Sequence, residues 1–104
     1  MQEIINFLTS NKAEDIQTFF CKEYICENVI VATTLNPIHS RSLAENFLIH
    51  LKSHNMSCTI DGDSQDGWVA VEVSGKNTII HLMTQPKRDY FRIEDIVSQL
   101  KKKV

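Results

Sequence analysis

Several residue types are scarce in this sequence, and each scarcity excludes a class of protein. The 104 residues include three Gly and two Pro, too few for a collagen-like, low-complexity or linker-rich chain. No apolar run approaches the length of a membrane-spanning helix. Lys and Arg number 11 against 13 Asp and Glu, so no basic field draws the chain to nucleic acid. We expect residues 1–104 to form one domain with a core that needs neither disulfide nor metal.

Cysteine is also scarce. Cys21, Cys26 and Cys58 are odd in number and lack a metal-binding spacing, which is typical of free thiols in a reducing compartment. The N-terminal residues have neither the basic and apolar regions of a secretory signal nor the Arg and Ser bias of a transit peptide. Together these features predict a cytoplasmic protein.

The pattern of apolar residues predicts helices alternating with strands. A helical period is seen in residues 3–10, from 37 to about 53, and 88–103. The second helix has a good N-cap in Asn36, and Pro37 suits its first position. Strand-like runs are residues 16–21, 29–33, 58–60, 68–73 and 78–84. We therefore expect an α/β (α+β) fold, with a mixed sheet of about five strands flanked by helices.

The last two predicted strands form a hairpin whose register assigns its two faces. Residues 74–77 supply Gly and Asn for the turn. If Val73 pairs with Thr78, one face is wholly aliphatic and belongs to the core. The other face then pairs Trp68 with Met83, Ala70 with His81, and Glu72 with Ile79.

The composition of this second hairpin face is typical of a protein interface with a polar edge. Alternatively, Trp68 packs under the last helix as part of the core, and the pattern alone leaves both interpretations open. A register slip of one residue would exchange the two faces.

Two groups of residues have types that could hold a metal. Asp61, Asp63 and Asp66 could bind magnesium for nucleotidyl transfer, but they lie in a Ser- and Gly-rich stretch that is typical of a solvated turn. His50 and His54 have a zinc-ligand spacing but no evident third ligand. The sequence contains no phosphate-binding Gly loop and no nucleophile motif. We expect a binding protein without catalytic residues, metal or cofactor.

Several short segments occur in a distinctive order across residues 12–97. They are Lys12–Ile16, Val31–Thr33 followed by His39, Leu43–Glu45, Asp61–Gly62, Gly67–Val69, Ile79–Met83, and Arg88–Phe91 continuing through Ile93–Glu94. In this order and spacing they resemble the family of ribosomal silencing factors (RsfS, also called Iojap-like). No single segment is specific, but the ordered set with its Trp, its His and its Arg-Asp-Tyr-Phe run is.

The resemblance implies a nucleotidyltransferase-like fold without enzymatic activity. It also implies binding to the large ribosomal subunit through ribosomal protein fourteen at the inter-subunit face. Such a factor blocks joining of the small subunit and represses translation when nutrients are short. It needs neither a membrane nor sequence-specific nucleic acid. With the hairpin face, the resemblance predicts a partner-binding surface made of Trp68, Ala70, Glu72, His81, Met83, Arg88, Tyr90 and Phe91.

The sequence departs from the family pattern at some positions, and two other functions also fit it. The departures are at Phe20, Asn36-Pro37, Phe91 and Val97. A ribosome assembly factor using the same docking surface is one alternative. A magnesium-dependent nucleotidyltransferase using Asp61 and Asp63 is another, although such a site needs acids that converge from neighbouring strands. An unbound hairpin face could also pair two copies of the chain.

Overall fold

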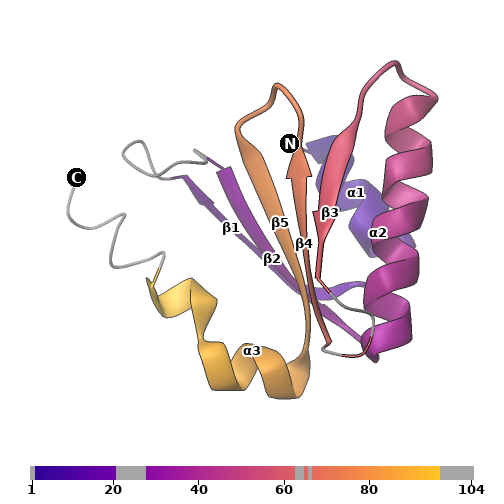
Figure 1. Ribbon diagram of the computed structural model, residues 1–104. Coiled ribbons are helices and arrows are strands. Elements are labelled where there is room, and N and C mark those ends of the chain that lie inside the picture. The colour runs from indigo at the N-terminus through magenta and orange to yellow at the C-terminus, as the bar shows by residue number, and fades with distance from the viewer. Residues whose placement is uncertain (1, 21–27, 63–64, 66, 97–104) are drawn as a thin grey trace.

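The described part of the chain forms one mixed sheet with helices on its faces (Figure 1). The structure is a computed structural model that describes residues 2–20, 28–62, 65 and 67–96. Its five strands are β1 (Glu14–Phe20), β2 (Asn28–Thr34), β3 (Cys58–Asp61), β4 (Trp68–Val73) and β5 (Thr78–Thr84). Their order is β1-β2-β5-β4-β3, with β2 parallel to β5 and every other pair antiparallel. This arrangement confirms the predicted α+β fold class.

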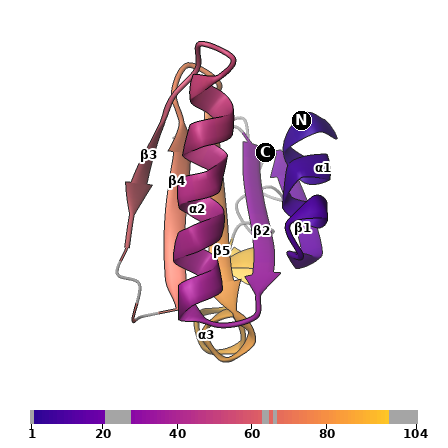
Figure 2. The ribbon, with the colours of Figure 1, turned by 90° about the vertical axis from the view of Figure 1, so that its right-hand side faces the viewer.

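Helices α1 (Gln2–Ser10) and α2 (Pro37–Lys52) cover the same face of the sheet (Figure 2). The main core lies beneath them, where Leu8 and Phe47 meet the aliphatic face of the hairpin. Asn36 caps α2 as predicted, because its side chain accepts a hydrogen bond from the backbone N–H of His39 at 2.8 Å. Among the described residues, no helix has the length and apolar character that a lipid bilayer crossing requires.

The hairpin of β4 and β5 has the predicted register. Val73 pairs with Thr78, and Trp68 pairs with Met83 at the other end. Gly75 and Asn77 in the turn adopt positive φ angles of 76° and 49°, as a four-residue connection requires. The predicted central strand is β2, which lies between β1 and β5 and is buried on both faces.

The last helix differs from the prediction. One continuous helix was expected over residues 88–103, but α3 (Gln85–Phe91) begins earlier, with Pro86 in its first turn. It ends at Arg92, whose left-handed φ of 50° breaks the helical path before residues 93–96 turn helically again. The continuous-helix prediction is therefore wrong at Arg92, and residues 97–103 lie outside the described ranges.

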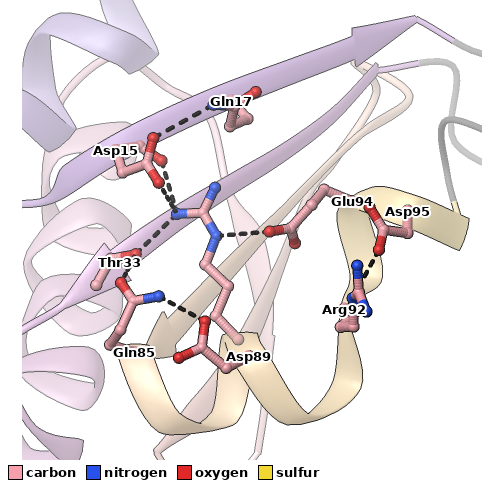
Figure 3. A network of polar contacts seen from close by, with 9 residues as sticks. Asp15, Gln17, Thr33, Gln85, Asp89, Arg92, Glu94 and Asp95 are labelled. Atoms are coloured by element: carbon pink, nitrogen blue, oxygen red, sulfur yellow. Dashed lines mark hydrogen bonds and ion pairs between the residues drawn. The ribbon is translucent and has the colours of Figure 1, made fainter.

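The edge strand β1 starts two residues before its predicted position and is irregular. Its register against β2 shifts between Glu14 and Gln17, and Asp15 within this bulge has a φ of 48°. A bulge re-aims the groups of the extra residue away from the ladder. Here it directs Asp15 toward the end of the sheet where α3 begins (Figure 3).

Candidate functional site

Strand order brings four separate segments to one end of the sheet. Because β4 and β5 are antiparallel, Trp68 at the start of β4 lies beside Met83 near the end of β5. The chain then enters α3 at once. Strand β3 ends at Asp61, which pairs with Ala70. This end of the sheet therefore carries most of the residues expected to bind a partner.

Three aromatic side chains form a continuous group, here called the aromatic patch: Trp68, Tyr90 and Phe91. The rings of Trp68 and Phe91 lie 4.8 Å apart at 46°, and those of Tyr90 and Phe91 lie 4.8 Å apart at 67°. Tyr90 is 74% exposed and Phe91 is 40% exposed, whereas Trp68 is half-buried. The patch therefore presents aromatic surface to solvent on a partly buried base.

His81 supports the indole of Trp68 from the neighbouring strand. The indole Nε1–H donates a hydrogen bond to His81 Nδ1 at 3.1 Å. Burial lowers the pKa of His81, because desolvation disfavours the charged imidazolium. The neutral ring can accept at Nδ1, whereas a doubly protonated ring could not. Neutral His81 therefore fixes the orientation of Trp68.

A shallow pocket of about 420 Å³ lies beside the aromatic patch. It is lined by Asp61, Gly62, Trp68, Ala70, Lys87 and Phe91. The ammonium of Lys87 lies 5.8 Å from the centre of the Phe91 ring, within the range of a cation–π contact. Among the described residues, the pocket lining therefore combines aromatic walls with one positive and one negative side chain.

Two residues expected on the binding surface are instead buried. Met83 is 0% exposed and packs with Val29 and Val31 in a second core cluster, against which Trp68 is seated. Its side chain shares the outer face with Trp68, but the surrounding side chains cover it. The sequence pattern left open whether Trp68 belongs to the core or to the surface. In the structure, part of its side chain packs on the second core cluster and part is exposed.

Arg88 is the second buried residue, with 2% of its surface exposed. Its Nη1 donates to the Asp15 carbonyl and to Thr33 Oγ1, both at 2.7 Å, and its Nε donates to Glu94 Oε1 at 3.1 Å. Asp15, Thr33 and Glu94 converge on this guanidinium from β1, β2 and the segment after α3 (Figure 3). Arg88 therefore lies inside the fold and presents almost no surface to a partner.

The remaining expected residues are spread more widely. Ala70 and His81 are half-buried and face each other across the hairpin, while Glu72 is exposed two pairs further from α3. Asp63 and Asp66 lie outside the described residues, as do Cys21 and Cys26. Cys58 is buried with a free thiol, and burial raises the pKa of that thiol. His50 and His54 contact each other through their rings at 4.9 Å.

The partners of Arg88 were missed by reasoning from the sequence. Asp15 is 73 positions away along the chain, and no periodic pattern joins residues at such a distance. Gln85 was missed too, although it lies at the start of α3 and bonds Asp89 Oδ1 at 2.8 Å. One available signal was an arginine inside a predicted amphipathic helix, since a buried arginine needs several polar partners.

The fold and the site together define a small α+β protein with an aromatic surface at one end of a mixed sheet. A family model described as "Ribosomal silencing factor during starvation" (RsfS) matches residues 1–103. The chain belongs to this family. Its members are regulatory factors, and the family resemblance of the short segments is thereby confirmed.

Solved structures agree with this assignment at the level of the fold. A protein of Chromobacterium violaceum is 26% identical, with a TM-score of 0.79, and the match covers 93% of this chain and 85% of that one. A protein of Bacillus halodurans is 16% identical, with a TM-score of 0.75, and the match covers 92% of this chain and 94% of that one. No protein among the curated sequences matches.

Proposed function

We propose that this cytoplasmic protein binds the large ribosomal subunit through ribosomal protein fourteen at the inter-subunit face. Bound there, it sterically blocks joining of the small subunit and so represses translation. Membership of the silencing-factor family supports the ribosome as the target. The aromatic patch is the observation that carries the proposal for the docking surface.

The aromatic patch has the features of a protein-binding anchor. Aromatic residues are enriched at interfaces, and the largest binding energies cluster on side chains such as Trp and Tyr. Here Trp68 is seated on the Met83 cluster and hydrogen-bonded to His81. Because its base is fixed in the free protein, the patch loses little conformational entropy when a partner covers it.

The charge of the chain favours a protein partner over ribosomal RNA. The formal net charge is -2, and phosphate backbones are bound mainly through clusters of Lys and Arg. In the described part of the pocket lining, Lys87 supplies the positive charge and Asp61 supplies a negative charge that offsets it. A surface of this composition suits a partner that supplies apolar side chains with a few polar groups of either sign.

Steric exclusion requires no chemistry from the bound protein. Two macromolecules cannot occupy the same face at once, so a factor docked at the inter-subunit face competes directly with the small subunit. The degree of repression is then set by the affinity and concentration of the factor. This mechanism uses the docking surface alone.

Sedimentation with separated subunits tests the proposal. The wild-type protein should pellet with large subunits, less with joined ribosomes, and not with small subunits. Phe91→Ala and Tyr90→Ala should each weaken large-subunit binding by about tenfold or more, since interface hot spots cost about 2 kcal/mol or more. Ile49→Ala is a matched control, because Ile49 is 66% exposed on α2, away from the patch.

Trp68→Ala should weaken binding most, but it should also lower stability, because the ring is partly buried against Met83, Val29 and Val31. Truncating a core Trp costs about 3–5 kcal/mol, so we expect a smaller loss for this half-buried ring. Equal binding to both subunits, or Phe91→Ala and Ile49→Ala variants that bind alike, would contradict the proposed surface. Loss of binding to isolated ribosomal protein fourteen on RNase treatment would contradict the protein-mediated contact.

A further inference from the structure

Helix α3, which carries Tyr90 and Phe91, is short and buries little of its own surface. It spans seven residues, and isolated helices of this length are unstable in water. Among its described residues, the one that is buried is Arg88. Its placement on the sheet therefore depends on tertiary contacts, of which the Arg88 network is the most extensive.

The contacts of Arg88 join three separate parts of the chain to α3. Its guanidinium reaches Asp15 in the bulge of β1, Thr33 near the end of β2, and Glu94 beyond the helix (Figure 3). Thr33 Oγ1 in turn lies 3.5 Å from Gln85 Oε1 at the start of α3. A guanidinium holds its donors in a rigid fork, which an ammonium group does not. The network therefore fixes both the position and the rotation of the helix.

The network is a costly way to gain stability. Burying the guanidinium of Arg88 carries a desolvation penalty, and its ion-pair partners Glu94 and Asp15 are themselves 29% and 61% exposed, which weakens the Coulombic gain that offsets it. Glu94 Oε2 is buried and has no hydrogen-bond partner among the described residues, and such an atom costs free energy. Asp15 adopts a strained positive φ while its carbonyl accepts from Arg88. Stability alone does not explain a network with these costs. A defined position for α3 does.

We propose that Arg88 is a positioning residue, which sets α3 on the sheet so that Phe91 lies against Trp68 and completes the aromatic patch. Arg88 is not exposed to a partner and acts through Phe91. The part of this inference that concerns binding rests on the proposed function, whereas the part that concerns the Trp68–Phe91 contact does not.

Fluorescence of Trp68 tests the positioning role without any ribosome. The sequence contains one Trp, so acrylamide quenching reports on this ring alone. In Arg88→Met the quenching constant should rise toward the value measured for Phe91→Ala, while circular dichroism still shows cooperative unfolding. Arg92→Met is a matched control, because Arg92 is 72% exposed and pairs with the exposed Asp95. It should quench as wild type does.

Arg88→Lys keeps the charge without the fork and covers the case in which Arg88→Met does not fold. We expect its quenching constant to lie between those of wild type and Phe91→Ala. A folded Arg88→Met or Arg88→Lys protein with wild-type quenching would overturn the inference.

A double-mutant cycle tests the binding part. Arg88→Met alone should weaken large-subunit binding about tenfold, or about 1.4 kcal/mol. In the Phe91→Ala background the same change should cost little more, because residues acting through one contact are non-additive. Additive losses would mean that Arg88 acts independently of Phe91 and would overturn the inference. If wild type itself fails to bind, the proposed function is contradicted, and quenching alone decides the role of Arg88.

Discussion

At the scale of single residues, the indole of Trp68 contacts the core and is also partly exposed to solvent. The ring packs on the cluster of Met83, Val29 and Val31 and also contacts Phe91. Its N–H is satisfied by His81, as a partly buried indole requires. A substitution or protonation that breaks this hydrogen bond therefore affects both the second core cluster and the aromatic patch.

Protonation of His81 should destabilise the fold. Burial lowers the pKa of His81 below its ordinary value of 6.5, so below that pH the unfolded chain binds more protons than the folded chain. The free energy of unfolding should therefore fall as the pH decreases, by at most about 1.4 kcal/mol per pH unit. Above pH 6.5 the stabilising contribution of neutral His81 is fully present.

Urea unfolding of wild type and His81→Asn across this pH range measures the effect. An Asn side-chain oxygen can accept from the Trp68 N–H but does not titrate. The difference in unfolding free energy should be constant at neutral and alkaline pH and should move in favour of His81→Asn as the pH falls. Parallel profiles at acidic pH would show that His81 does not couple to stability.

At the scale of elements, helices α2 and α3 are held by different forces. Helix α2 is long, is capped by Asn36, and buries Leu43, Phe47 and Leu51 in the main core. The short α3 is held by the polar contacts of Arg88 and by the Phe91 ring. Apolar burial tolerates small shifts, whereas hydrogen-bond geometry is narrow. The helix that carries Tyr90 and Phe91 therefore depends for its placement on directional polar contacts more than on apolar burial.

Gly62 allows β3 to approach the start of β4 beside Trp68, at the proposed docking surface. A Cβ at this position would lie 2.5 Å from the backbone oxygen of Trp68, and its φ is 124°. We expect Gly62→Ala to cost about 3 kcal/mol or more, because backbone strain of about 1–3 kcal/mol adds to this clash. The added Cβ should also push the backbone of Trp68 away from Gly62.

Gly75→Ala is the matched control for this substitution. Gly75 also has a positive φ, 76°, but nothing lies within 4 Å of the added Cβ. We expect a cost of about 1–2 kcal/mol, from the backbone conformation alone. Chemical denaturation of both variants gives the comparison. Equal losses would show that the close approach at Gly62 contributes nothing.

At the scale of the whole molecule, α1 and α2 cover one face of the sheet (Figures 1 and 2), and the proposed docking surface belongs to the other face. The two faces therefore have separate roles, since one buries the main core and the other carries the second core and the aromatic patch. The net charge of -2 leaves no strong electrostatic attraction to ribosomal RNA.

Large-subunit binding should accordingly depend weakly on salt. A protein that neutralises six to ten phosphates loses about 10³–10⁵ in affinity between about 50 and 200 mM salt. We expect a loss of less than about tenfold here, because the proposed partner is a protein and few counterions are released. Sedimentation at fixed magnesium and varied monovalent salt measures this slope. A steep slope would indicate that the contact is made through RNA.

The sequence by itself determined the parts of this protein that depend on local and periodic information. Strands β4 and β5, their register and the aliphatic face of the hairpin follow from alternation and a short turn, because a four-residue connection leaves little freedom for slippage. The Asn36 cap of α2 follows from the chemistry of one side chain. The ordered short segments indicated the family, and that family is the one to which the chain belongs.

Tertiary structure alone decided which residues of the predicted surface are exposed. Met83 shares a strand face with His81, yet the packing of Val29, Val31 and Trp68 covers it. Arg88 bonds Asp15, which is 73 positions away in the sequence. Its burial depends on the bulge of β1 and on the left-handed conformation of Arg92, and hydrophobic periodicity predicts neither of these. Alternation assigns a side chain to a face of the sheet, but burial is set by whatever the rest of the chain places over that face.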